Sequence, residues 1–91
     1  MADKRKLSVK LPERIQGGVY ANQMVVSHTR EEFVLDFVNL FPPEGVVNAR
    51  VIVSPGHLKR MIGALQDNLA RYEKAHGTVT IAQVPNAGSL N

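Results

Sequence analysis

Runs rich in apolar and β-branched residues, separated by turn residues, occupy much of the first 53 residues, and the first run, Leu7–Leu11, alternates apolar and polar residues as a half-buried β-strand does. Four such stretches are present, and together they predict four strands: Leu7–Leu11, Val19–His28, Phe33–Phe41 and Val46–Val53. Pro12, the Gly17-Gly18 pair and the Pro42-Pro43 pair separate them, and these residue types are typical of turns or of strand ends. The short connections favour consecutive antiparallel hairpins.

The pattern changes after residue 53 to a spacing of three and four, which predicts one long amphipathic helix from 55 to about 76. Ser54 is the expected N-cap, Pro55 suits the first helical position, and Gly77 is the expected residue at the helix end. The apolar stripe of this helix consists of Leu58, Met61, Ile62, Leu65, Leu69 and Tyr72.

These elements predict an α+β domain: a four-stranded antiparallel meander sheet followed by a C-terminal helix that packs on one sheet face. The segment 78–84 could form a fifth short strand or an extended tail. We expect a single domain over residues 7–77, because 91 residues suit one domain. A basic, flexible arm over residues 1–6 precedes it, and a tail over residues 78–91, disordered from Pro85 onward, follows it.

Opposite charges in neighbouring strands predict the register of the sheet. Pairing Leu40 with Val46 across the proline loop also sets Asp36 opposite Arg50, and a slip of one residue would separate these charges. A turn at Arg30-Glu31 then pairs the second strand with the third, so that Val26 faces Leu35 and Met24 faces Phe37.

In this register both faces of the sheet are apolar. One face carries Tyr20, Met24, Val26, Phe33, Leu35, Phe37, Ala49, Val51 and Val53, and we expect the helix to cover it. The other face carries Val19, Ala21, Val25, Val34, Asp36, Val38, Leu40, Val46, Arg50 and Ile52. A single helix cannot cover both faces, and soluble monomers rarely expose an apolar patch of this size.

The second face therefore predicts self-association, as a dimer or a dimer of dimers. Within it, the Asp36–Arg50 pair could determine how two sheets meet. The alternative is internal coverage, in which Leu7–Leu11 and Val79–Ile81 fold over the sheet and complete a small barrel or sandwich.

The net charge of +3 suggests a second function, binding of nucleic acid. The excess lies in residues 1–14, which hold five basic residues against Asp3 and Glu13, while the rest of the chain is formally neutral. A nucleic-acid-associated protein would use this arm, through Lys4, Arg5, Lys6 and Lys10. The neutral body and the three Phe and two Tyr residues make this the weaker hypothesis, because few aromatic residues are present to stack on bases.

The absence of cysteine excludes a disulfide framework, a thiolate zinc site and a cysteine nucleophile. The polar start lacks the apolar run of a signal peptide, and no apolar run approaches the ~18 residues of a membrane span. We therefore expect a cytoplasmic protein without a membrane partner.

The chemistry-bearing residues are scattered. His28, His57 and His76 lie in different elements and share no metal-ligand spacing, and Ser27-His28 with Asp36 has the residue types of a triad without a nucleophile elbow. The helix start from Ser54 to Arg60 could bind an anion, or it could be an ordinary N-cap with a solvated pair of charges. We expect no catalytic residue, metal or cofactor, and no enzyme activity.

The chain resembles a small bacterial family known only as domain of unknown function 3467. The resemblance rests on Val19–Asn22, Glu32–Phe37 and Arg50–Pro55, and on residues along the helix: His57, Lys59, Arg60, Ala64, Leu65, Asn68, Tyr72 and Glu73. It covers residues 7–77 and implies a short bacterial protein of unassigned activity. The order of elements, four strands and then a helix, is also similar to the bacterial export chaperone that assembles as a dimer of dimers.

Overall fold

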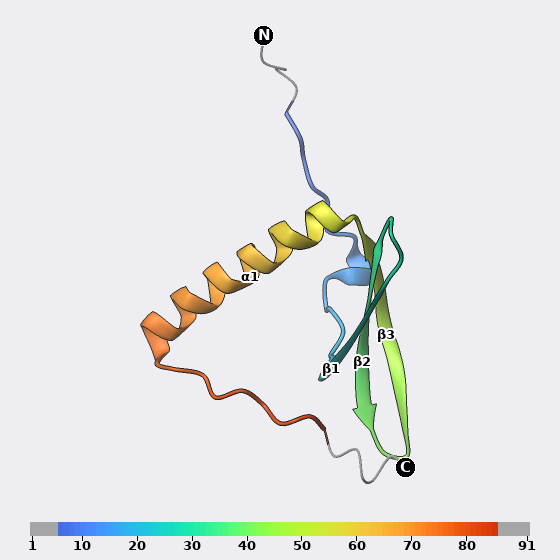
Figure 1. Ribbon diagram of the computed structural model, residues 1–91, viewed down its shortest axis with the longest axis vertical. Coiled ribbons are helices and arrows are strands. Elements are labelled where there is room, and N and C mark those ends of the chain that lie inside the picture. The colour runs from blue at the N-terminus through green and yellow to red at the C-terminus, as the bar shows by residue number, and fades with distance from the viewer. Residues whose placement is uncertain (1–5, 86–91) are drawn as a thin grey trace.

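The protein is built from a three-stranded antiparallel sheet and one long helix (Figure 1). The computed structural model describes residues 6–85. Its elements are the short 3-10 turn η1 (Glu13–Ile15), the strands β1 (Gln23–His28), β2 (Phe33–Phe41) and β3 (Glu44–Val53), and the helix α1 (Pro55–His76). The α+β class and the meander order β1-β2-β3 agree with the prediction.

The predicted register is confirmed over most of the sheet. Asp36 pairs with Arg50, Val26 with Leu35 and Met24 with Phe37. The turn between β1 and β2 has Arg30 and Glu31 at its centre, and the Thr29 N–H donates to the Glu32 carbonyl oxygen at 2.9 Å. The Thr29 hydroxyl also accepts the N–H groups of Glu31 and Glu32, so this short loop satisfies its own backbone donors.

A β-bulge in β3 corrects the prediction near the proline loop. Phe37 pairs with Ala49 but Val38 pairs with Val47, so Asn48 is an extra residue without a partner in β2. Leu40 therefore lies opposite Gly45 and not opposite Val46. The predicted pairing of Leu40 with Val46 is wrong because it assumed one uniform register along both strands, whereas the inserted residue shifts the register by one.

The predicted first strand, Leu7–Leu11, is not formed. This segment has no partner strand, and the Leu7 side chain is 96% exposed. The second predicted strand also begins later, at Gln23, so residues 19–22 lie outside the sheet. Alternation shows which residues could pair in a ladder, but a strand forms only where a neighbouring backbone supplies hydrogen bonds.

Two asparagines fasten the segment before β1 to the sheet. The Asn22 side chain donates to the Leu40 carbonyl at 3.0 Å and accepts the Leu40 N–H at 2.7 Å, as a neighbouring strand would. The Asn48 side chain, at the bulge, donates to the Tyr20 carbonyl at 2.7 Å. Residues 20–22 are therefore held by β2 and β3 together.

The helix has the predicted bounds and the predicted caps. The Ser54 hydroxyl accepts the His57 N–H at 3.2 Å, and Pro55 occupies the first position. At the other end the Gly77 N–H donates to the Glu73 carbonyl at 2.8 Å. Gly77 has a φ of +95°, a region in which a residue with a Cβ is strained.

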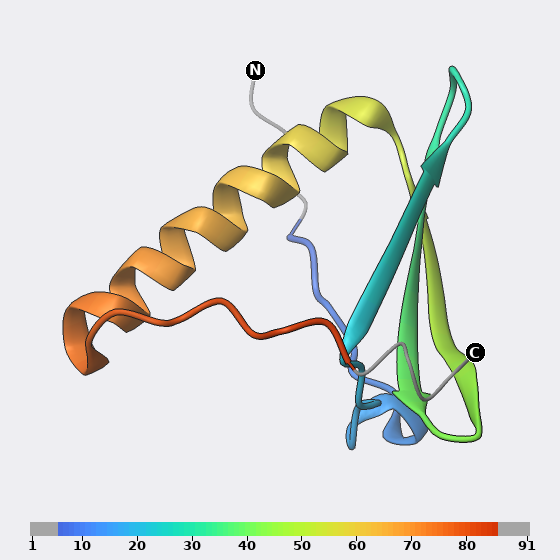
Figure 2. The same cartoon turned by 60° about the horizontal axis from the view of Figure 1, so that its bottom comes forward.

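The helix does not pack along the sheet, which corrects the predicted architecture. It begins at the end of β3 and diverges from the sheet, as both views show (Figures 1 and 2). None of its residues is buried. The change from strand to helix occurs at Ser54, whose backbone is extended, and Pro55 begins the helix. An apolar stripe on a helix predicts that some surface covers it, but the stripe does not specify whether that surface belongs to the same chain or to another molecule.

The segment that follows the helix is extended and forms no strand over residues 78–84. It returns from the helix end toward the lower part of the sheet (Figure 2). Its first contact is with the helix, where the Val79 N–H donates to a Glu73 carboxylate oxygen at 2.8 Å. The expected disorder of the tail beyond Pro85 concerns residues 86–91, which lie outside the described residues, as do residues 1–5 of the predicted arm.

We predict that Asn22→Ala lowers the free energy of unfolding by roughly 2 kcal/mol, because two part-buried hydrogen bonds at about 1 kcal/mol each are lost. Urea unfolding followed by circular dichroism measures the change. Asn68→Ala, on the exposed helix, is the matched control and should be neutral or slightly stabilising. Equal midpoints for wild type and Asn22→Ala would contradict the prediction.

Candidate interaction surfaces

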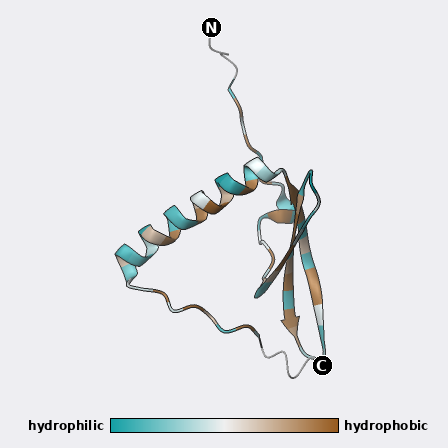
Figure 3. Ribbon diagram, viewed as in Figure 1, coloured by the Kyte–Doolittle hydropathy of each residue, from teal (hydrophilic) through white to brown (hydrophobic). Residues whose placement is uncertain are grey.

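Most large apolar side chains of this protein are exposed. Among the described residues only Leu35, 4% exposed, and Val38, 8% exposed, form a buried core. Many of the exposed apolar side chains come from the three strands and the helix: Met24, Val25, Val26, Phe41, Val46, Val47, Val51, Ile52, Ile62, Leu65, Leu69 and Tyr72. The others come from the segments before β1 and after α1: Leu7, Val9, Leu11, Ile15, Val19, Tyr20, Val79, Ile81 and Val84. In Figure 3 the strands are largely hydrophobic, and hydrophobic segments recur along the helix.

The large exposed area and the extended shape of the chain agree with the exposure of its apolar side chains. It exposes 8388 Å², whereas a compact monomer of this length exposes about 5,200 Å². Its radius of gyration is 17.0 Å, against about 12 Å for a compact domain of 91 residues. The divergence of the helix from the sheet contributes to this difference, and so do the exposed extended segments before β1 and after α1.

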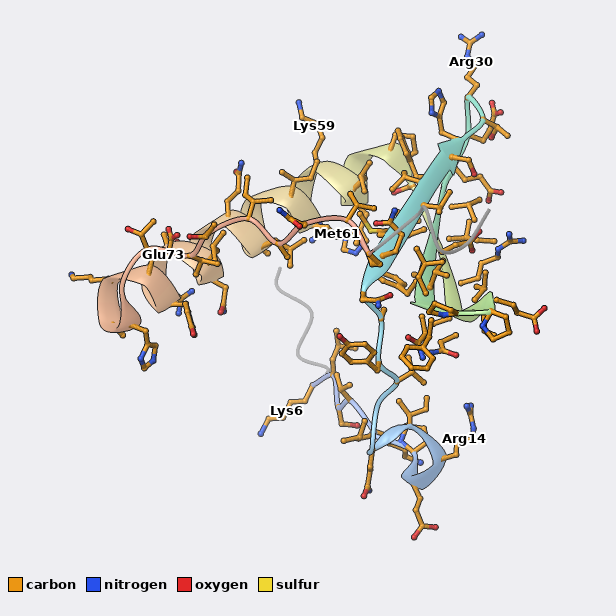
Figure 4. The ribbon with its side chains drawn as sticks, turned by 90° about the horizontal axis from the view of Figure 1, so that it is seen from below. Lys6, Arg14, Arg30, Lys59, Met61 and Glu73 are labelled. Atoms are coloured by element: carbon orange, nitrogen blue, oxygen red, sulfur yellow. The ribbon has the colours of Figure 1, made fainter. Side chains whose placement is uncertain are left out.

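The helix stripe, defined as Ile62, Leu65, Leu69 and Tyr72, is the most continuous of these surfaces. These residues recur at intervals of three or four, so they lie on one side of α1. Leu65 is 68% exposed, although it lies at the centre of the stripe. Near the first turns Leu58 and Met61 are half-buried, and Figure 4 shows Lys59 pointing outward, away from the sheet.

The second sheet face is largely as predicted, with one exchange. The register places Val25, Val34, Asp36, Val38, Leu40, Val47, Arg50 and Ile52 on it, and we call this set face two. The bulge turns Val46 to the opposite face and puts Val47 in its place. Val19 and Ala21, also predicted there, lie before β1 and outside the sheet. Val25, Val47 and Ile52 are exposed, and Val38 is buried.

An ion pair crosses the middle of face two. The Arg50 guanidinium donates from Nε to one Asp36 carboxylate oxygen at 2.6 Å and from Nη2 to the other at 2.8 Å. This two-point hydrogen bond, helped by the positive charge and opposed by desolvation, holds the pKa of Asp36 below its ordinary value of 3.8. The same bond raises the pKa of Arg50. The predicted charge pair is therefore made in full.

The basic residues of the predicted nucleic-acid arm do not form a described patch. Lys4 and Arg5 lie outside the described residues, and Lys6 and Lys10 are exposed on an extended segment. Figure 4 shows Lys6, Arg30 and Lys59 pointing in different directions from the segments that carry them. Within residues 6–85, the geometry therefore adds nothing to the nucleic-acid hypothesis.

Each histidine has a partner in its own neighbourhood. His28 lies 5.1 Å from Phe33 between ring centroids, and His76 lies 4.8 Å from Tyr72. Over residues 6–85, no group of three His, Asp or Glu side chains comes close enough to hold a metal ion. His28 pairs with Phe33 on the face opposite Asp36, so the Ser27, His28 and Asp36 side chains cannot act together as a triad.

The helix start is an ordinary cap with a local side-chain contact. Arg60 Nη2 lies 2.9 Å from His57 Nδ1, and the Leu58 N–H donates to the Ser54 carbonyl oxygen at 2.9 Å. A shallow cavity of about 560 Å³ lies elsewhere, where the segment from Arg14 to Val19 meets β3 at Asn48–Val51. Ile15, Val19 and Val51 line it together with Arg14 and Arg50.

The comparisons with known proteins bear on family and not on activity. A family model described as "Protein of unknown function (DUF3467)" matches residues 1–81. The chain belongs to this family. No curated protein and no solved structure matches the chain. In the part of the chain that the structure describes, no helix has both the length and the apolar character needed to cross a bilayer.

Two features of this DUF3467 member were missed by sequence reasoning. Asn22 and Asn48 hold the segment before β1, and their pattern, a polar amide inside a β-rich run, was the available signal. The exposed helix stripe was also missed as an interaction surface, because its spacing is the same whether the covering surface belongs to the same chain or to another.

We predict that the Asp36–Arg50 pair stabilises the fold above about pH 4 and that this stabilisation disappears in acid. Because the folded pKa lies below the unfolded value of about 3.9, the contribution is complete above the unfolded pKa. It is lost as pH falls through the folded pKa. The stability difference between wild type and Asp36→Asn should thus be constant from pH 5 to 7 and shrink below pH 4.

Urea unfolding at half-unit pH steps measures this difference. Asp67→Asn, which removes the exposed Asp67–Arg71 helix pair at 2.8 Å, is the control and should cost less at pH 7. A difference that stays constant down to pH 2.5 would refute the assignment to Asp36.

Proposed function

We propose that this protein is a homo-oligomeric interaction module, of the adaptor or chaperone-like kind, without a catalytic role. The observation that supports it best is the helix stripe, an apolar surface on a helix that is capped at both ends and that its own sheet leaves uncovered. Exposed apolar surface of this extent is typical of proteins that bind other proteins.

A second copy is the simplest covering surface. Each copy offers two kinds of unpaired surface, a helix stripe and apolar sheet faces, so each can cover the other reciprocally about a two-fold axis. Contact of the helix of one copy with the sheet of another gives the layered arrangement in which α+β domains normally bury their apolar residues.

The available area is sufficient. A stable dimer buries about 800 Å² on each partner. The chain exposes roughly 3,000 Å² more than a compact monomer of this length does, enough for two such interfaces. A dimer of dimers, in which one interface uses the helix stripe and another uses the sheet, would bury about half of this excess.

Face two supports the adaptor or chaperone-like part of the proposal. It combines exposed valines and an isoleucine with one central ion pair, in which Arg50 remains 62% exposed while Asp36 is 14% exposed. Exposed apolar side chains bind many partners through the hydrophobic effect, and a fixed charge pair restricts which surfaces fit. We propose that this pair determines how face two docks.

We expect the double variant Leu65→Glu, Leu69→Glu to lower the solution mass, because two carboxylates cannot be buried in an apolar interface. Size-exclusion chromatography with light scattering measures the mass across a range of concentrations. The matched control is Gln66→Glu, a neighbouring helix position outside the stripe, which should keep the wild-type mass.

Self-association and a stable monomer predict opposite results in this experiment. If copies cover the stripe, the double variant loses mass and its helix content falls or its melting temperature drops. A wild-type protein that is a monomer at high concentration, with a double variant of equal stability, would overturn the proposal.

A second variant tests the ion pair in assembly. Asp36→Ala leaves Arg50 without its partner, so we expect weaker or heterogeneous assembly, seen as a lower average mass or a broadened mass distribution. Asp67→Ala, which removes the other aspartate–arginine pair, is the control and should assemble as wild type does. An unchanged and homogeneous mass for Asp36→Ala would exclude this role for the pair.

A further inference from the structure

The two edges of the sheet differ in how they are protected. The β3 edge carries the charged residues Glu44 and Arg50 and the bulge at Asn48. Residues of the segment from Arg14 to Val19 also line a cavity together with β3 residues Asn48–Val51. Bulges, charges and covering segments are the means by which proteins prevent edge strands from pairing with other chains.

The β1 edge has none of these protections. Within the described residues β1 pairs with β2 alone, so its other side has no neighbour. Its six residues, Gln23–His28, include no Lys, Arg, Asp, Glu or Pro, and its pairing with β2 shows no bulge. Met24 is 48% exposed, Val25 52% and Val26 45%, so the edge is apolar on both faces.

We propose that two copies of this chain pair through their β1 edges, antiparallel, to form one continuous six-stranded sheet. This interface rests on the homo-oligomer proposed above and identifies one of its contact surfaces. Each β1 backbone then gains the second neighbour that it lacks in a single copy.

The alternation of side chains restricts the register of this pairing. A two-fold axis between antiparallel edge strands is perpendicular to the sheet, so each face of one copy continues into the same face of the other. Residues directly opposite each other share a face, and β1 residues with odd numbers lie on face two while even ones lie on the other face. An odd-numbered residue of one copy must therefore lie opposite an odd-numbered residue of the other. Near the middle of β1 two registers satisfy this condition: Val25 opposite Val25 of the second copy, or Val26 opposite Val26.

Side-chain chemistry favours Val25 opposite Val25. In that register Met24 faces Val26 of the second copy, and Gln23 faces Ser27 of the second copy. Apolar residues then meet apolar residues, and the two polar residues can hydrogen-bond across the strands. Centring on Val26 would set Val25 against Ser27 and Met24 against His28, which mixes polar and apolar partners.

The residues on either side of Val25 are similar in kind, apolar at 24 and 26 and polar at 23 and 27. This near-symmetry is the reason to choose a second copy over another occupant of the edge. The competing occupant is the extended segment Leu7–Leu11, which also lacks a strand partner. Lys10 would then add a charge to an edge without an acidic residue. A β1 strand from a second copy brings no charge and matches every apolar position.

Single cysteines test the pairing, because the chain has none of its own. Opposite residues in an antiparallel pair have Cα atoms about 4.5–5.5 Å apart, within the span of a disulfide. In the proposed register Val25→Cys should form a disulfide-linked dimer rapidly under mild oxidation. Val26→Cys would place its Cα atoms about 8 Å apart, too far for a disulfide, and should link at least tenfold more slowly.

Val47→Cys, an equally exposed valine on β3, is the matched control and should also link slowly. Circular dichroism and the reduced mass establish that each variant folds and assembles as wild type. Faster linkage of Val26→Cys than of Val25→Cys would overturn the register.

Two further outcomes separate this inference from the proposed function. If wild type is an oligomer by light scattering but neither β1 cysteine links, the edge pairing is wrong and the homo-oligomer stands. If Val9→Cys mixed with Val25→Cys gives the dominant linked product, Leu7–Leu11 occupies the edge and the pairing is again overturned. A monomeric wild type overturns both.

Discussion

The hydrophobic effect acts here on a helix that diverges from its own sheet. Burial of apolar area stabilises a protein by about 25 cal/mol for each Å², yet the helix stripe and much of both sheet faces remain in contact with solvent in the single chain. Of the residues that the structure describes, only Leu35 and Val38 are buried. A chain with so small a core depends on a second surface, and both the proposed function and the proposed sheet pairing follow from this.

Polar contacts, and not a large core, hold the single copy together. The Asp36–Arg50 pair holds β2 and β3 in register across face two. Asn22 pairs with both backbone groups of Leu40, and Asn48 reaches Tyr20. These directional bonds keep the sheet in shape while its apolar faces remain available to partners.

The bulge at Asn48 shows how a local irregularity affects the candidate surfaces. One inserted residue turns Val46 away from face two and puts Val47 there. It also protects the β3 edge, where the ladder is disrupted, and leaves the regular β1 edge as the exposed one. A single residue therefore influences both which side chains a partner meets and which edge can pair.

Local chemistry made several features predictable from the sequence. Ser54, Pro55 and Gly77 predicted the helix bounds, since capping depends on residues within one turn. Opposite charges and turn residues predicted most of the register, because these are contacts between neighbouring strands. Face two was likewise predicted apart from Val19, Ala21 and Val46.

Only the tertiary structure decided whether each apolar segment found a partner. Leu7–Leu11 alternates as a strand does, yet no neighbouring backbone pairs with it. The helix has an ordinary amphipathic stripe, yet its direction from Val53 leads away from the sheet. Periodicity records which side of a segment avoids water, whereas the identity of the covering surface depends on contacts between residues distant in the chain or in another copy.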